Sequence, residues 1–185
     1  MEDDRRRRFE LLALPHLDAA YNLARWLAGN AADAEDVLQD AYLRAFRYFD
    51  AFRGPDFRVW LLSIVRNSFL SWAKSNRSAR LVFGATEQTD PTVQEETLWG
   101  EASNDPETAL MRNVDRSTLA RLVEGLPPEY REVLLLREVE ELSYRDIAGI
   151  VGVPVGTVMS RLARARLLLR RRWHEAAARE GADGM

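Results

Sequence analysis

The chain of 185 residues contains no cysteine, which excludes disulfides, thiolate zinc sites and cysteine nucleophiles. Its two histidines, His16 and His174, lie far apart in sequence. A metal site would therefore have to consist of carboxylates, and no calcium-loop spacing is present. The sequence also lacks a nucleophile elbow, a phosphate-binding loop and a histidine–carboxylate arrangement. It predicts a protein that is not an enzyme and that holds neither a metal nor a cofactor.

Long apolar runs are also missing. The apolar stretches are broken within about seven residues, whereas a membrane-spanning helix needs about 20. The charged N-terminus, MEDDRRRR, is not followed by the apolar run of a signal peptide. We therefore expect a soluble, cytoplasmic protein with no direct membrane insertion.

Charge is unevenly distributed along the chain. The net charge of −3 argues against a stand-alone, non-specific nucleic-acid binder. However, residues 58–80 and 161–172 carry five and six basic residues and no acid, whereas residues 81–110 carry seven acids and no lysine or arginine. This distribution favours two nucleic-acid contacts within a larger assembly. The alternative is that the arginine-rich helices are simply solvated faces.

The hydrophobic pattern is helical throughout. Glycine and proline are sparse within residues 9–50 and 111–151, and apolar residues recur at spacings of three and four. Residues 84–108 are instead acidic and polar and are interrupted by glycine and proline. The sequence thus predicts an all-α fold with two small helical domains, at 9–80 and 108–175, joined by a flexible acidic linker at 81–107.

Three helices are expected in the first domain, at about residues 11–28, 33–49 and 56–76, with Asp33 and Asp56 as N-caps. The core face of the second helix would carry Leu38, Ala41, Tyr42, Ala45 and Phe49. Its other face carries Asp36, Asp40, Leu43 and Arg47, with Gln39 and Phe46 at its flank, so that the apolar Leu43 and Phe46 lie among polar side chains. This face either binds a partner or packs on a neighbouring helix of the same domain.

The third helix has a core side that includes Phe57, Leu61 and Val65. The opposite arc is basic and polar, and it holds Ser63, Arg66, Asn67 and Lys74. Such an arc suits DNA, because arginine and lysine bind phosphates while nearby aromatic rings stack on bases. The tryptophans of this helix lie on the apolar stripe, so we interpret them as core residues rather than as stacking platforms.

The sharpest pattern lies between residues 142 and 170. Ser143 and Asp146 have the spacing of a capping box, Gly152 suits a turn with positive φ, and Pro154 opens the next helix. Ala148, Gly152 and Val158 match the spacing of a DNA-binding helix-turn-helix, in which a small residue allows the two helices to cross closely. The second helix would bury Val158, Leu162, Ala165 and Leu169 and present Thr157, Ser160, Arg161 and Arg164 to the major groove. An ordinary helical hairpin is the alternative.

These motifs resemble a known family. The segments LPPEYREVLLLR (126–137), LSYRDIA (142–148) and VGTVMSRLARAR (155–166) are similar to region 4 of the extracytoplasmic-function (ECF) sigma factors of the sigma-70 family. The segments DAEDVLQDAYLRAF (33–46) and FRVWLLSIVRN (57–67) resemble their region 2. The resemblance covers about four fifths of the chain, in the right order.

The resemblance implies that this chain binds core RNA polymerase, promoter DNA and an anti-sigma factor. Docking on the β′ coiled coil, with further contact to the β subunit, would involve Asp36, Gln39, Asp40, Phe46 and the neighbouring Leu43. The −10 element would be recognised by Ser63, Arg66, Asn67 and Lys74, and the −35 element by Thr157, Ser160, Arg161 and Arg164. Met159 and Ala163 depart from residues common in the family, which bears on the −35 sequence preference.

Two other functions compete with a promoter-directing sigma factor. A sigma-like protein that only sequesters an anti-sigma factor would not need the arginine face on the second helix of the helix-turn-helix. A helix-turn-helix transcriptional repressor would not need the outward apolar residues of the helix at 33–49.

Overall fold

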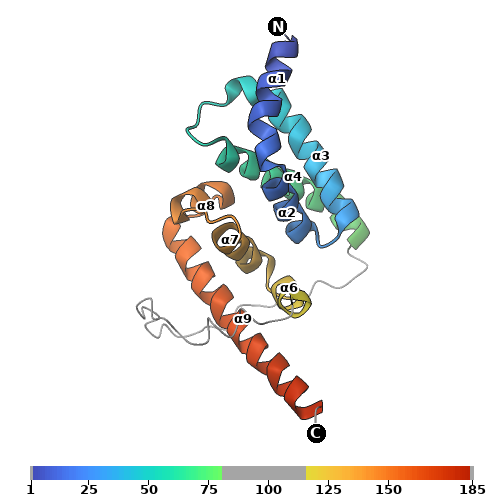
Figure 1. Ribbon diagram of the computed structural model, residues 1–185, viewed down its shortest axis with the longest axis vertical. Coiled ribbons are helices and arrows are strands. Elements are labelled where there is room, and N and C mark those ends of the chain that lie inside the picture. Colours follow the sequence, from blue (N-terminus) through green and yellow to red (C-terminus); the bar gives the residue numbers. More distant parts are fainter. Residues whose placement is uncertain (1, 81–115, 184–185) are drawn as a thin grey trace.

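The computed structural model describes residues 2–80 and 116–183. Within these ranges every regular element is a helix, as expected for an all-α protein. The helices form two bundles, one from each described range, which lie against each other (Figure 1). The linker predicted at 81–107 lies outside the described residues.

The N-terminal bundle comprises α1 (Glu2–Ala13), η1 (Leu14–His16), α2 (Leu17–Ala28), α3 (Ala31–Tyr48), η2 (Phe49–Ala51) and α4 (Phe57–Arg80). Helices α2, α3 and α4 pack against one another. Gly29 ends α2 with a φ of 83°, a left-handed conformation that glycine adopts without steric cost. The Asn30 side chain then accepts a hydrogen bond from the Asp33 amide at 2.9 Å. The N-cap of α3 is therefore Asn30 and not Asp33, which the capping pattern had favoured.

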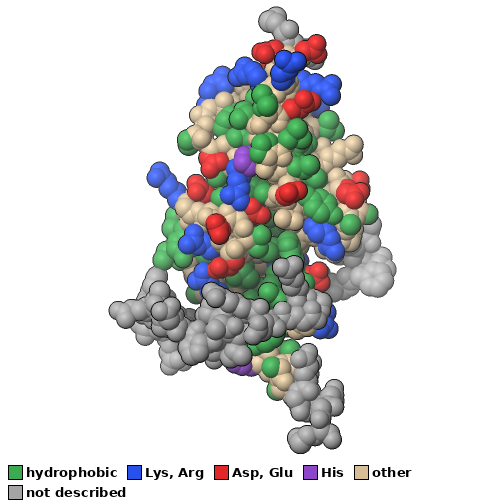
Figure 2. Space-filling model, viewed as in Figure 1, with side chains coloured by type: hydrophobic (Ala, Val, Ile, Leu, Met, Phe, Trp, Pro, Cys, Tyr) green, Lys and Arg blue, Asp and Glu red, His purple; other side chains and the backbone are tan. Residues whose placement is uncertain are grey.

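The helix expected at 11–28 is interrupted, because Pro15 lies in the short 3-10 turn η1 and cannot donate a backbone hydrogen bond. A further helix, α1, precedes it and contains the arginine run Arg5–Arg8. Figure 2 shows basic side chains gathered around the N-terminal end of the molecule, where α1 begins. This helix was not expected from the sequence, although Phe9 and Ala13 lie four residues apart and are both buried.

An aromatic cluster fills the end of the N-terminal bundle where α1 crosses α3. The Phe9 ring makes edge-to-face contacts with Phe46, Phe49 and Phe57 at centroid distances of 5.3, 5.4 and 6.2 Å. Such edge-to-face pairs contribute about 0.5–1.5 kcal/mol beyond the burial of their area. The cluster therefore fixes α1 to the bundle.

The C-terminal bundle comprises α6 (Arg116–Glu124), α7 (Pro128–Glu138), α8 (Tyr144–Val151) and α9 (Val155–Asp183). Its core contains the four α9 residues expected there, Val158, Leu162, Ala165 and Leu169, all buried. Helix α7 lies across α9 and α8 and supplies the apolar run Val133–Leu136. The C-terminal part of α9 projects away from both bundles (Figure 1).

The two bundles meet where α4 packs on α8 and α2 packs on α7. A small cavity at this junction is lined from one side by Asn22, Leu23 and Trp26. From the other side it is lined by Leu135, Leu136, Val139 and Glu140. Mostly apolar side chains from both bundles thus meet around this cavity.

Candidate DNA and partner interfaces

Helices α8 and α9 form the expected helix-turn-helix geometry. Ser143 caps α8, because its hydroxyl accepts from the Asp146 amide at 3.1 Å and donates to the Asp146 carboxylate at 2.6 Å. Gly152 ends α8 with a φ of 75°. The axes of α8 and α9 then differ by 99°, within the range of about 90–120° typical of this motif. The expected capping and turn residues are confirmed.

The residues expected to read DNA from α9 lie near its N-terminal end. Ser160 and Arg164 are exposed, and Thr157 and Arg161 are half-buried. The Ser160 hydroxyl donates to the Thr157 carbonyl at 3.0 Å, and the Arg164 guanidinium lies 3.5 Å from the Tyr130 hydroxyl. The four side chains thus come from one stretch of helix opposite its buried stripe, which is how a recognition helix presents side chains to a groove.

The residues expected to contact DNA from α4 do not share one environment. Asn67 and Lys74 are exposed. Ser63 is half-buried, and its hydroxyl donates to the Trp60 carbonyl at 2.6 Å. Arg66 departs from the expected open arc, because only 16% of its side chain is exposed and it pairs with Glu132 of α7. Helix periodicity places a residue on a face but does not show that another domain covers that face.

The junction between the bundles is rich in ion pairs. Arg66 makes two contacts with the Glu132 carboxylate, from Nε to Oε1 and from Nη2 to Oε2, the second at 3.4 Å. Arg58 pairs with Glu140, whose side chain is 8% exposed. The Arg131 guanidinium donates to the Trp26 carbonyl at the end of α2, at 3.0 Å, and to the Leu126 carbonyl, also at 3.0 Å. None of these links between the bundles was foreseen from the sequence.

Glu132 is the most buried carboxylate of this group. Burial raises the pKa of Glu132, and the positive charges of Arg66 and Arg161 act in the opposite direction. An arginine from each bundle therefore stabilises the charged form of the same carboxylate. The sequence signal was an acid directly before the apolar run Val133–Leu136, where a charged group is unusual.

The outward face of α3 is only partly as expected. Asp36 and Gln39 are exposed, Leu43 is 64% exposed, and Asp40 pairs with Arg44 at 2.7 Å. Phe46, in contrast, is half-buried against Phe9. Of the two explanations left open, exposure therefore fits Leu43, and packing on a neighbouring helix fits Phe46.

A shallow groove runs beside this face. Its lining residues come from α2 and α3: Leu17, Glu35, Asp36, Leu38, Gln39 and Tyr42. Burial raises the pKa of Tyr42 to about 12, and its hydroxyl donates to the Ala13 carbonyl at 3.2 Å. The helix period placed Leu38 and Tyr42 on the core stripe, and both are in fact half-buried at the groove. An apolar floor with carboxylates beside it suits an amphipathic helix that carries basic residues.

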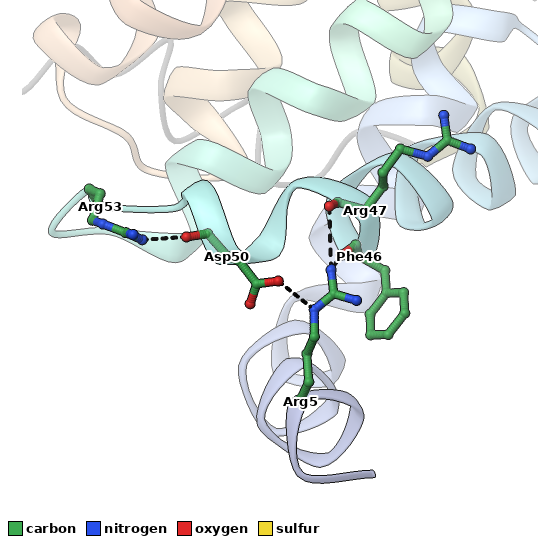
Figure 3. Close-up of polar contacts among 5 residues, drawn as sticks. All are labelled: Arg5, Phe46, Arg47, Asp50 and Arg53. Atoms are coloured by element: carbon green, nitrogen blue, oxygen red, sulfur yellow. Dashed lines mark hydrogen bonds and ion pairs between the residues drawn. The ribbon is translucent and has the colours of Figure 1, made fainter. Parts of the chain in front are cut away.

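Arg5 holds the C-terminal end of α3 (Figure 3). Its Nη2 donates to the carbonyls of Phe46 and Arg47 at 2.7 and 3.3 Å, and its Nε lies 2.8 Å from the Asp50 carboxylate. A cation at this position adds a donor to carbonyls in the last turn of α3, where the Phe46 carbonyl also accepts from the Phe49 amide, and it interacts favourably with the helix dipole. Arg5, one of the four arginines in the run Arg5–Arg8, thus has a structural role.

The described residues contain no group of three or more histidine, cysteine or carboxylate side chains placed to hold a metal ion. Within the same ranges no single helix is long and apolar enough to cross a membrane. A bent pair formed by α8 and residues 155–178 of α9 does pass that test together. The fold and its candidate interfaces define a two-domain helical protein with a helix-turn-helix in its second domain.

Comparison with known proteins identifies the family. The chain matches the models for Sigma-70 region 2 over residues 12–79 and for Sigma-70, region 4 over residues 116–169. It is 34% identical over 168 residues to the RNA polymerase sigma-H factor of Pseudomonas aeruginosa, a match that covers 87% of this chain and 83% of that protein. It is 36% identical over 139 residues to the ECF RNA polymerase sigma-E factor of Escherichia coli, covering 74% of this chain and 71% of that protein.

A solved structure shows the same fold. The sigma factor RpoE from Bartonella quintana, determined in complex with the anti-sigma factor NepR, superimposes with a TM-score of 0.67 and 27% identity. The match covers 89% of this chain and 95% of that one. The chain therefore belongs to the ECF sigma factors of the sigma-70 family, as its motifs had indicated.

Proposed function

We propose that this sigma factor binds core RNA polymerase through its N-terminal bundle and reads promoter DNA through α4 and α9, without catalysing a reaction itself. The observation that carries the proposal is the capped helix-turn-helix of α8 and α9, joined in one chain to a region 2 bundle. In this proposal residues 9–80 and 108–175 are the functional domains. The protein acts in the cytoplasm, where polymerase and DNA are found.

Polymerase docking is assigned to α3. Asp36, Gln39 and Leu43 are exposed, and Asp40 adds a carboxylate beside them. We assign the β′ coiled coil to this face and to the adjoining groove, with further contact to the β subunit. Phe46 contributes indirectly, because its ring supports the helix against Phe9 and Arg5.

Promoter contacts are assigned to two helices. Ser63, Arg66, Asn67 and Lys74 of α4 bind the −10 element, and Thr157, Ser160, Arg161 and Arg164 of α9 bind the −35 element. Arginine side chains make bidentate contacts with guanine edges, whereas serine and threonine hydroxyls donate to several acceptors. Because the similar Bartonella sigma factor was solved with an anti-sigma factor, we also propose an anti-sigma partner for this chain.

Run-off transcription tests the proposal. Purified protein and core polymerase are incubated with a fragmented genomic template, and discrete transcripts that depend on the protein are expected. Binding to polymerase without transcripts would favour a sigma-like protein that only sequesters an anti-sigma factor. Tight DNA binding without any association with polymerase would favour a repressor.

A further inference from the structure

Exposed leucines gather where α1 passes through η1 into α2. Four of the ten large apolar side chains that are exposed among the described residues fall between residues 11 and 17. Leu11 and Leu14 are the most exposed of these four, at 70% and 59%. Single exposed apolar residues are ordinary, but a group of this kind marks an interaction surface.

The two leucines belong to a stripe with a charged residue at each end. The stripe consists of four exposed residues, Arg7, Leu11, Leu14 and Asp18. Their spacings of four, three and four residues place them on one side of a helix. The helical path continues through η1, because the residues that flank this turn keep right-handed helical dihedrals. The order along the stripe is therefore base, leucine, leucine, acid.

The two end charges of the stripe are available to a partner. Within residues 2–80 and 116–183, neither Arg7 nor Asp18 forms an ion pair. Arg6, directly before Arg7, is instead paired with Glu10 at 2.8 Å. The apolar part of the stripe thus lies between an unpaired cation and an unpaired anion.

We propose that this stripe is a surface through which two copies of the chain associate, with the stripes antiparallel about a twofold axis between Leu11 and Leu14. Leu11 then meets the partner's Leu14, and Arg7 meets the partner's Asp18. Symmetry produces each of these contacts twice. A twofold interface requires a patch that is complementary to itself, and the base–leucine–leucine–acid order meets that requirement.

Self-association would cover part of the groove beside α3. Leu17, which directly precedes Asp18, lines that groove together with Tyr42. Burial and, after it, the charge of Asp18 raise the pKa of Tyr42, so the end of the stripe lies close to the groove. A second copy therefore competes with polymerase docking. This consequence rests on the proposed function, whereas the self-association does not.

Sedimentation velocity of the full chain tests the association. A small interface lies at the weak end of specific contacts, so we expect a dimer with a Kd of about 10 μM, visible between about 1 and 100 μM protein. Leu11→Ser with Leu14→Ser should abolish the dimer over this range. Leu167→Ser is the matched control, because it changes an exposed leucine of α9 and should leave the dimer unchanged.

Charge exchange tests the pairing itself. Arg7→Asp alone and Asp18→Arg alone each place like charges opposite one another at both ends of the interface. Each variant should therefore associate with itself about tenfold more weakly than the wild type. An equimolar mixture of the two variants should form a heterodimer about as tight as the wild-type dimer, because both of its charge pairs are opposite again. A mixture no tighter than either variant alone would contradict the antiparallel pairing.

The outcomes separate this inference from the proposed function. A wild-type chain that stays monomeric throughout, or a leucine double variant that still dimerises, would overturn the self-association and leave the sigma function intact. Weaker binding of core polymerase by the leucine variant at nanomolar protein would assign the stripe to polymerase docking and would also overturn the inference. Failure of the wild type to bind core polymerase would contradict the proposed function and leave the dimer in place.

Discussion

The guanidinium of Arg5 lies 4.5 Å from the ring centroid of Phe46 and donates to the Phe46 carbonyl at 2.7 Å. The same side chain forms an ion pair with Asp50, so one residue of α1 links the C-terminal end of α3 to the turn that follows it. Arg5→Ala should therefore destabilise the protein by about 2 kcal/mol, since it removes charge-assisted hydrogen bonds. Arg7→Ala is the control, because Arg7 lies on the same helix and is exposed. Equal unfolding midpoints in urea for the two variants would contradict the role given to Arg5.

The turn of the helix-turn-helix offers a matched pair of glycines. Gly152 has a φ of 75°, whereas Gly149 lies inside α8, and a Cβ at either position would meet nothing within 4 Å. Gly152→Ala should cost about 1–2 kcal/mol because of backbone strain alone. Gly149→Ala should stabilise the protein by about 0.5–1 kcal/mol, because alanine loses less entropy in a helix. Urea unfolding measures both changes, and the same sign for the two would refute this account of the turn.

Promoter recognition by α9 predicts weaker transcription when its arginines are removed. Arg161→Ala or Arg164→Ala should weaken promoter use by about 1–3 kcal/mol for each bidentate base pairing that the substitution removes. Arg164 is the cleaner position, because Arg161 also acts on Glu132. Arg171→Ala is a suitable control, since Arg171 pairs with Glu175 at 3.7 Å beyond the buried stripe of α9. Transcription is measured at several promoter concentrations. Wild-type promoter use by both variants would show that neither arginine recognises the promoter.

Polymerase docking on α3 is best tested at exposed positions. Asp36→Arg with Leu43→Ala should weaken binding to core polymerase about tenfold or more, because it reverses a charge and removes an apolar contact. Phe46→Ala in place of Leu43→Ala would also disturb Phe9 and Arg5, so a loss of affinity there would mix docking with folding. Leu167→Ala removes an exposed leucine from α9 and serves as the control. Wild-type affinity in the α3 double variant, by fluorescence anisotropy, would remove the docking assignment.

The raised pKa of Glu132 predicts a pH dependence of stability. The folded protein holds the Glu132 proton more tightly than an unfolded chain, in which the group titrates near 4.5. Its contribution to stability is thus largest below that value and is lost as the pH rises through the folded pKa. Relative to Glu132→Gln, the wild-type unfolding midpoint should increase as the pH falls from neutral toward 4.5. A difference between the two proteins that does not vary with pH would indicate that burial leaves the Glu132 pKa unshifted.

Local features of the fold were predictable because their signals lie within a few residues of each other. Ser143 and Asp146 are three residues apart, and the Gly152 turn depends only on its own backbone. The buried stripe of α9 follows directly from helix periodicity. The helix-turn-helix could therefore be placed almost residue by residue.

Long-range contacts were not predictable in the same way. Arg5 meets Phe46 across 41 residues, and Arg66 meets Glu132 across 66. No periodicity relates such positions, since each contact depends on how separate helices pack. The environments of Phe46 and Arg66 therefore differed from expectation, even though their places on the helix wheel were correct.

The length of α9 has a practical consequence. The helix continues from Val155 to Asp183, and among the side chains that the structure describes its last buried one is Leu169. The helical segment beyond Leu169 extends about 21 Å, at about 1.5 Å per residue. A fluorophore attached near the Asp183 end of this helical segment would thus sit clear of the buried core of both bundles, which makes the segment a suitable attachment point for single-molecule work.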